Sequence, residues 1–222
     1  MRNKTKKQIA DLRRRAEQGD AKAHHNLGLL YANGEAVPQN YSVARQWFER
    51  AVAQGNAGAQ YDLGLLYANG EGVPQDYKKA RQWWLQAAAQ GYAQGQHTLG
   101  VLYEDGKGVP QDYGKARGWY EKSAAQGYAE AQYHLGFLFA KGLGVPQDYA
   151  QARQWYTQAA ARRHTGAMLN LGLLYIGGQG VPQDDAKAQQ WWEKAAAQGD
   201  ANAQKILEIM FAYTGKARTR AA

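Results

Sequence analysis

The sequence predicts an all-α fold: an α-solenoid, a right-handed superhelix of five 36-residue helix-turn-helix repeats with a half-repeat cap at each end. Three residue patterns that share one period predict it. The dipeptide Leu-Gly, the dipeptide Val-Pro and a Trp each recur five times at intervals of 36 residues, without any insertion. The Leu residues are Leu27, Leu63, Leu99, Leu135 and Leu171, the prolines are Pro38, Pro74, Pro110, Pro146 and Pro182, and the Trp residues are Trp47, Trp83, Trp119, Trp155 and Trp191.

Within each repeat, the apolar spacing predicts two helices. In the second copy, one set of apolar residues has the spacing i, i+4, i+7 and i+8, and a later set has the spacing i, i+3, i+4, i+7 and i+8. The first set is Ala59, Leu63, Leu66 and Tyr67, and the second set is Ala80, Trp83, Trp84, Ala87 and Ala88. One repeat cannot bury both apolar faces by itself, so neighbouring repeats must stack and cover them.

The turn between the two helices is rich in glycine and ends in a helix-capping residue. The capping residue is Asp76 in the second copy, and the equivalent residues are Asn40, Asp112, Asp148 and Asp184. Where the second helix should end, four copies carry a glycine suited to a left-handed conformation: Gly55, Gly91, Gly127 and Gly199. Arg163 replaces this glycine in the fourth copy, which predicts a strained or altered turn.

The two helices of a repeat are expected to approach closely at the glycine of the Leu-Gly pair. Gly28 and its equivalents leave room there, and a pair of bulky rings, such as Trp83 and Trp84, fills the space between the helices.

Basic residues are confined to the two ends of the chain. Of a net charge of +8, residues 1–18 carry +5 and residues 215–222 carry +3, so residues 19–214 are formally neutral. We therefore divide the chain into a basic N-terminal capping helix (1–18), a repeat array (19–213) and a basic C-terminal tail (214–222).

Composition excludes several classes of site and of protein. The chain has no Cys, which excludes disulfides, thiolate metal sites and cysteine nucleophiles. The N-terminal segment has no apolar stretch typical of a secretory leader, and no segment has the ~20 apolar residues of a membrane-spanning helix. We expect a cytoplasmic protein, or a periplasmic or secreted one only if a leader has been removed.

The repeat resembles a known family. The pattern Ala-x-x-x-Leu-Gly-x-x-Tyr-x-x-Gly-x-Gly-Val-Pro-x-Asp-Tyr-x-x-Ala-x-x-Trp-Tyr/Trp-x-x-Ala-Ala-x-x-Gly, seen in residues 59–91 and 95–127, is similar to the Sel-one-like repeat, a relative of the tetratricopeptide repeat. The resemblance covers residues 19–213, and the departures from it are Ala36, Gly95, Phe139 and Arg163. It implies a non-enzymatic adaptor that holds a protein partner on a superhelical surface, as bacterial members do in signalling, host interaction and effector-related proteins.

By analogy with tetratricopeptide arrays, the first helix of each repeat lines the concave face. Two columns of residues that differ between copies are expected to project there and to bind a protein or peptide. The first column is His25, Tyr61, His97, Tyr133 and Leu169, and the second column is Leu29, Leu65, Val101, Phe137 and Leu173. The second column is equally compatible with interior packing.

Neither catalysis nor metal binding has a motif in this sequence. The five His residues form neither an H-E-x-x-H motif nor an i, i+4 pair, and the glycine-rich loops join two helices rather than a strand and a helix. Neither Ser42 nor Ser123 lies in a nucleophile motif, and Ser123 occupies a position that is Ala in four copies. The sequence therefore predicts no enzyme, no catalytic residue, no cofactor and no metal.

Two functions remain at this point. The first is a scaffold that binds a partner such as a regulator, an effector or a toxin, which it neutralises or localises. The second is association with nucleic acid or anionic lipid through the basic ends. The neutral array disfavours nucleic acid, because phosphate binding needs a continuous basic surface.

Overall fold

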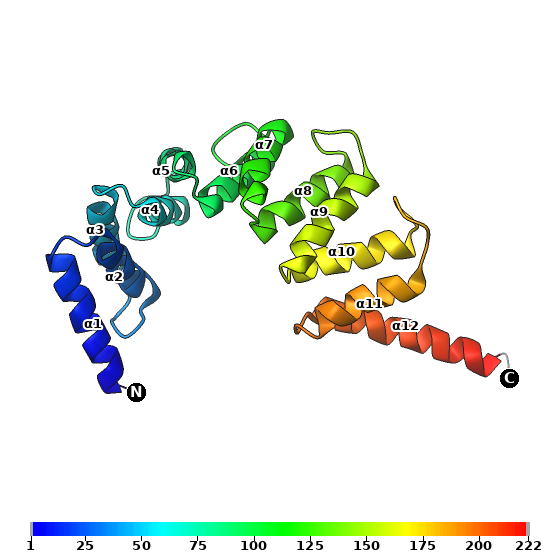
Figure 1. Cartoon of the computed structure of the whole chain (residues 1–222). Helices are drawn as coiled ribbons and strands as arrows, with labels where there is room; N and C mark the ends of the chain where they lie inside the picture. Colours follow the sequence, from blue (N-terminus) through cyan, green and yellow to red (C-terminus); the bar gives the residue numbers. More distant parts are fainter. Residues whose placement is uncertain (1, 221–222) are drawn as a thin grey trace. The chain divides into compact units, whose positions relative to one another are not determined.

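The structure is a computed structural model that describes the backbone of residues 2–220 and the side chains of residues 7–210 and 212. Twelve helices and no strands are formed within the described backbone (Figure 1). The helices are α1 (Arg2–Glu17), α2 (Ala21–Asn33), α3 (Tyr41–Val52), α4 (Ala57–Asn69), α5 (Tyr77–Ala89), α6 (Ala93–Asp105), α7 (Tyr113–Ala125), α8 (Ala129–Lys141), α9 (Tyr149–Ala161), α10 (Thr165–Ile176), α11 (Asp185–Ala196) and α12 (Ala201–Arg220). The all-α repeat fold predicted from the sequence is confirmed.

The chain forms two compact units. Unit 1 contains residues 1–111 and unit 2 contains residues 112–222. Within each unit, a helix packs mainly against the helix before it and the helix after it in the sequence. Such nearest-neighbour packing is typical of a solenoid. In every complete repeat, an even-numbered helix is the first helix and the following odd-numbered helix is the second.

The predicted caps begin all five second helices. The side chains of Asn40, Asp76, Asp112, Asp148 and Asp184 each accept a hydrogen bond from a backbone N–H in the first turn. Asp148 Oδ1, for example, accepts from the Gln151 amide at 2.9 Å. These bonds satisfy donors that the start of a helix leaves without a partner, so each repeat fixes where its second helix begins.

The turns after the second helices are left-handed, as predicted. Gly55, Gly91 and Gly199 have φ of 77°, 82° and 85°. Arg163 keeps the same conformation, with φ of 68°, and Ala36 adopts φ of 62° in a loop where other copies have glycine. A Cβ in this conformation meets the backbone, so these two residues are strained.

In four of the five repeats, those of Gly28, Gly64, Gly136 and Gly172, the core contains a bulky ring packed on a glycine. The second ring of each pair is buried: Phe48, Trp84, Tyr120, Tyr156 and Trp192 are at most 3% exposed. A Cβ on Gly28, Gly64 or Gly172 would clash with the buried ring of the same repeat, and one on Gly136 would lie 2.5 Å from Tyr156 Cδ1. The glycine is therefore what lets the ring lie against the first helix, as the sequence predicted.

The first ring of each pair is only half-buried. Its outer face lies under a cationic side chain in three repeats: Arg50 is 4.6 Å from the ring centroid of Trp47, Lys122 is 4.2 Å from that of Trp119, and Lys194 is 4.2 Å from that of Trp191. The two rings therefore differ in role, because only the second fills the space between helices.

The first and last helices lack one partner helix each and carry polar residues where inner repeats are apolar. In α1, Gln8 and Arg15 stand where the fully buried Ala44 and Ala51 stand in α3. In α12, Glu208 replaces the ring-packing glycine. The segment predicted as a tail from residue 214 continues α12 through Arg220, and its side chains lie outside the described residues.

Gly64→Ala is expected to lower the free energy of unfolding by about 2 kcal/mol, because the new methyl group displaces the Trp84 indole. Urea unfolding followed by circular dichroism measures the change. Gly118→Ala is the matched control, since a Cβ on this helical glycine meets nothing within 4 Å. It should stabilise the chain by up to about 1 kcal/mol. If both variants lose the same free energy of unfolding, Gly64 is not required for the packing of Trp84.

Ala36→Gly is expected to stabilise the chain by about 0.5–1 kcal/mol, because it removes the strain of a left-handed alanine. The reciprocal change Gly72→Ala should destabilise it, since φ there is +69° and the new Cβ would lie 2.8 Å from Tyr41 Cβ. The thermal unfolding midpoints of the two variants should shift in opposite directions. Shifts of the same sign would show that Ala36 is not strained.

Candidate functional site

In each unit, a pocket opens on the face formed by the first helices of that unit, which we call the first-helix face. The unit 1 pocket has a volume of about 430 Å³ and the unit 2 pocket one of about 380 Å³. Ten of the eleven lining residues of one pocket have an equivalent in the other, three repeats along the chain; Asn69 and Tyr133 are the exceptions. The unit 1 pocket is lined by Leu29, Ala32, Asn33, Gln39, Tyr41, Phe48, Asp62, Leu65, Leu66, Asn69 and Glu71. The unit 2 pocket is lined by Tyr133, Phe137, Ala140, Lys141, Gln147, Tyr149, Tyr156, Asn170, Leu173, Leu174 and Gln179.

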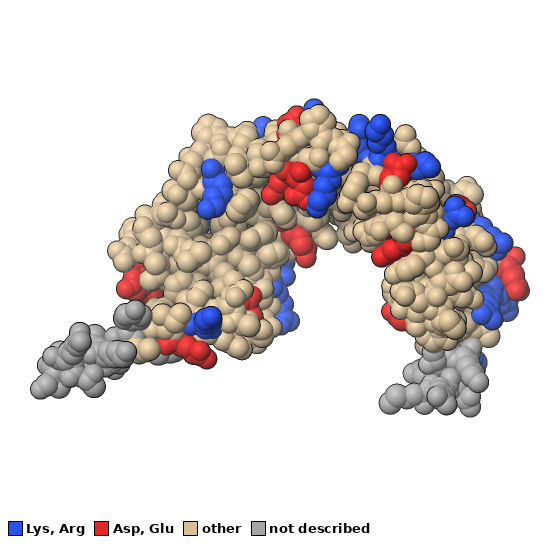
Figure 2. All heavy atoms as spheres, turned by 180° about the vertical axis from the view of Figure 1, so that it is seen from behind, with Lys and Arg blue, Asp and Glu red and all other residues tan. Residues whose placement is uncertain are grey.

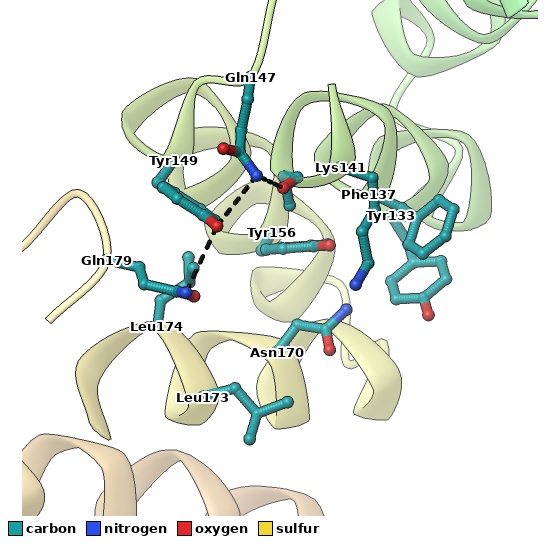
Figure 3. Close-up of a pocket in the computed structure, with 11 residues that line it drawn as sticks. Tyr133, Phe137, Lys141, Gln147, Tyr149, Tyr156, Asn170, Leu173, Leu174 and Gln179 are labelled. Carbon is teal, nitrogen blue, oxygen red and sulfur yellow. Dashed lines mark hydrogen bonds between the residues drawn. The ribbon is translucent and has the colours of Figure 1, made fainter. Parts of the chain in front are cut away.

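The unit 2 pocket lies between two successive first helices, α8 and α10. The buried ring of Tyr156, from α9, lies at its base, and the loop between α8 and α9 contributes Gln147 (Figure 3). The ring that packs the repeat together therefore also supports the pocket.

A glutamine fixes the loop beside each pocket. Gln147 Nε2 donates to the Ala140 carbonyl at 2.8 Å and to the Tyr149 hydroxyl at 3.0 Å (Figure 3). In unit 1, Gln39 Nε2 donates to the Ala32 carbonyl at 2.8 Å and to the Tyr41 hydroxyl at 3.0 Å. A glutamine follows every Val-Pro pair, but the sequence analysis did not single it out, because only the fold shows which carbonyl it reaches.

The second predicted column lines both pockets. Leu29 and Leu65 lie in the unit 1 pocket, and Phe137 and Leu173 lie in the unit 2 pocket. The structure rules out fully interior packing for this column, because its members are half-buried and Leu173 is 51% exposed. Val101 is half-buried on α6 and lines neither pocket. That this column binds a partner stays a prediction.

The first predicted column has mixed surroundings. Tyr133 lines the unit 2 pocket and stacks on His164, with ring centroids 4.5 Å apart. Leu169 packs against the core of unit 2 instead. His25, Tyr61 and His97 are half-buried on α2, α4 and α6.

A third column, which the sequence analysis missed, reaches into the pockets. It directly follows the first column and reads Asn26, Asp62, Thr98, His134 and Asn170. Asp62 lines the unit 1 pocket and Asn170 the unit 2 pocket. The polar residues of this column differ between copies, and this variation was the one sequence signal that could have revealed the column. That the column faces the preceding repeat follows only from the stacked fold.

In unit 1, two residues of the third column contact the first column of the preceding repeat. The His25 Nε2 atom lies 2.6 Å from Asp62 Oδ2, with both side chains mostly shielded from solvent. Tyr61 makes the equivalent hydrogen bond with Thr98. These polar contacts fix the lateral position of one first helix against the next.

Burial tunes the ionisable groups of this face. It raises the pKa of Tyr61, against the opposing effect of the Thr98 hydrogen bond, and it raises the pKa of Tyr156. Both phenols therefore stay protonated at neutral pH and keep a hydrogen-bond donor. Burial lowers the pKa of His164, so the imidazole stacked on Tyr133 is neutral at pH 7.

The described residues offer little for catalysis or for metal binding. No group of three or more His, Asp or Glu side chains within them is arranged to hold a metal ion. Ser123 is fully buried in α7, away from any substrate. Within the same part of the chain, no helix is long and apolar enough to cross a membrane.

The basic N-terminal segment is partly neutralised by its own acids. Arg14 pairs with Asp11 and Arg15 with Asp20, each at 2.6 Å. On the face drawn in Figure 2, Lys and Arg lie interspersed with Asp and Glu. Lys7 and Arg13 are exposed, and the remaining basic residues of the two ends have side chains that lie outside the described part.

Comparison with known proteins identifies the repeat. The Sel1 repeat family matches residues 21–56, 57–92, 93–128, 129–164 and 165–200. Among solved structures, a Sel1 repeat protein from Oxalobacter formigenes is 31% identical, with a TM-score of 0.83 over 87% of this chain and 79% of that chain. Comparison with curated proteins finds no significant match.

Two further solved structures are similar to this chain, one a longer protein and one with a more distant sequence. A protective antigen of uropathogenic Escherichia coli with the same repeat fold is 40% identical, with a TM-score of 0.80 over 87% of this chain; this chain spans only 41% of that protein. An immunity protein from Pseudomonas aeruginosa is 20% identical, with a TM-score of 0.59 over 85% of this chain and 72% of that chain, and shares the fold.

Gln147→Ala is expected to destabilise the loop of the unit 2 pocket by about 1–2 kcal/mol, because two hydrogen bonds are lost. Amide hydrogen exchange should accelerate at Asp148, whose N–H donates to the Phe139 carbonyl at 2.9 Å. Gln183→Ala is the control, since Gln183 bonds only the exposed Asp185 carboxylate at 3.2 Å. If the Asp148 amide exchanges at the same rate in Gln147→Ala and in Gln183→Ala, Gln147 does not fix the loop.

Proposed function

The chain belongs to the Sel1 repeat family, whose members generally act as scaffolds for protein–protein interaction, and from this premise we propose that it is a non-enzymatic adaptor that binds a segment of a partner protein on its first-helix face. Within a unit, the partner segment occupies the pocket and contacts the members of the two predicted columns beside it.

One observation carries this proposal: apolar side chains stay exposed on the first-helix face. Leu173 is 51% exposed and Ile209, at the equivalent position of the next first helix, is 49% exposed. Phe137 precedes them by one repeat and is half-buried. An apolar row at constant spacing on a folded surface favours a role in binding, because its exposure to water has no benefit for folding.

The division between constant and variable positions supports the same function. The ring-packing glycine and the capping residue recur with little change and hold the repeat together. Five of the ten corresponding positions that line the two pockets differ between units, so the same framework presents two different surfaces. Such a division suits a scaffold whose specificity lies in a few side chains.

We place the partner among bacterial regulators, or effectors that binding neutralises or localises. The Escherichia coli and Oxalobacter formigenes relatives, 40% and 31% identical to this chain, are bacterial proteins. The alternative, association with nucleic acid or anionic lipid through the basic ends, is favoured only by the charge of residues 1–18 and 215–222. Salt-insensitive binding, or binding that survives deletion of both segments, would exclude that alternative.

The double variant Phe137→Ala/Leu173→Ala is expected to weaken peptide binding about tenfold or more, because two partly exposed apolar contacts are removed together. Peptides are first selected by display on the wild-type chain, and their affinities are then measured by fluorescence anisotropy.

Gln154→Ala/Gln190→Ala is the matched control, because both residues are exposed on second helices, α9 and α11. Its affinities should equal those of the wild type. If the Phe137→Ala/Leu173→Ala variant keeps full affinity and native helix content, the first-helix face of unit 2 is not the binding surface.

A further inference from the structure

We propose that the unit 2 pocket binds the carboxylate of an Asp or Glu side chain in the partner segment, between Lys141 and Asn170, with an adjacent apolar side chain of that segment on Phe137 and Leu173. This inference rests on the proposed function and adds the chemistry of the bound segment. It assigns one residue type to one pocket.

Lys141 is the only charged residue that lines the unit 2 pocket. It lies at the end of α8 and is exposed, and no carboxylate of the described residues lies within ion-pair distance of it. Other lysines of the array do have such partners: Lys79, Lys115 and Lys187 pair with the aspartate that caps their own helix, at 3.9, 2.9 and 3.0 Å. Lys141 is therefore a cation available to a ligand.

Neutral hydrogen-bonding groups surround this cation. In Figure 3, the Lys141 side chain extends from α8 toward Asn170 of α10, with the Tyr156 hydroxyl beside them. Asn170 is hydrogen-bonded to Tyr156, and a carboxamide with two N–H donors and one acceptor retains bonding capacity after that contact. A carboxylate here gains a charge-assisted hydrogen bond from Lys141 and meets no negative side chain of the pocket.

The equivalent pocket of unit 1 has the opposite charge. Asn33 stands where unit 2 has Lys141, Asp62 where it has Asn170, and Glu71 where it has Gln179. Relative to the unit 2 pocket, the unit 1 pocket therefore lacks one cation and has two additional carboxylates. A carboxylate ligand fits the unit 2 pocket and is repelled from the unit 1 pocket.

The apolar lining favours a side chain over a free anion. Phe137 and Leu173 belong to the same pocket as Lys141, and Ile209 continues the apolar row on the next first helix. A free inorganic anion uses only the polar part of such a site. A peptide that carries an acidic residue beside Leu or Phe uses both parts.

The test uses the full chain and fluorescein-labelled peptide pools. In three pools, a central Glu, Gln or Lys is flanked by positions randomised among Leu, Phe, Ala and Ser. We expect the Glu pool to bind about threefold to tenfold more tightly than the Gln pool at low ionic strength, and the Lys pool to bind most weakly. The difference should shrink at about 0.5 M NaCl, because the charges are screened.

Lys141→Gln should abolish the preference for Glu, and Lys141→Glu should reverse it. Lys22→Gln, which removes an exposed lysine from the first turn of α2, is the control and should leave the preference unchanged. A preference for Glu that persists in Lys141→Gln, or displacement of the Glu pool by inorganic phosphate at the same concentration as by unlabelled Glu peptides, would overturn the inference.

The same measurements separate this inference from the proposed function. If all pools bind equally and Phe137→Ala/Leu173→Ala weakens them all, the carboxylate site is wrong and the binding face is retained. If no pool binds and that double variant has no effect on display-selected peptides either, both the carboxylate site and the proposed binding face are wrong.

Discussion

The contact on which the whole array depends is that of a buried ring on a glycine. Because Gly64 has no side chain, the Trp84 indole lies directly on the first helix and its Nε1 donates to the Tyr61 carbonyl at 3.1 Å. In the last repeat, Trp192 makes the same bond to the Leu169 carbonyl at 3.1 Å. The rings that line the two pockets, Phe48 and Tyr156, pack in the same way on Gly28 and Gly136, so the framework and the candidate site share these contacts.

The residues that determine the framework of this protein are mostly not those that set the charge of its surface. Caps, glycines and buried rings recur in each repeat and determine the geometry, while the pocket linings of unit 1 and unit 2 differ in charge. A change of the exposed Lys141 therefore alters the charge of the surface without a change in the packed core. This separation allows one repeat architecture to serve many partners without loss of stability.

Features of the fold that depend on spacing along the chain were predictable from sequence. The period gave the helix pairs, and the substitution of Arg163 for glycine correctly indicated a strained turn, because both follow from local backbone geometry. The third column and the glutamine of the loop were missed. Their partners lie in another helix, and which face a residue such as Asp62 presents follows from the stacking of repeats rather than from its own helix. The charge difference between the pockets became visible only when those residues were placed together.

Nearest-neighbour packing within each unit also affects how the chain is made. Because a helix finds its main partners in the helices directly before and after it, few distant segments must meet before native structure forms. Contacts of short sequence separation are associated with rapid folding. Each hairpin can thus dock on its predecessor while the ribosome is still synthesising later repeats, which keeps the exposed rings of unfinished chains few and short-lived.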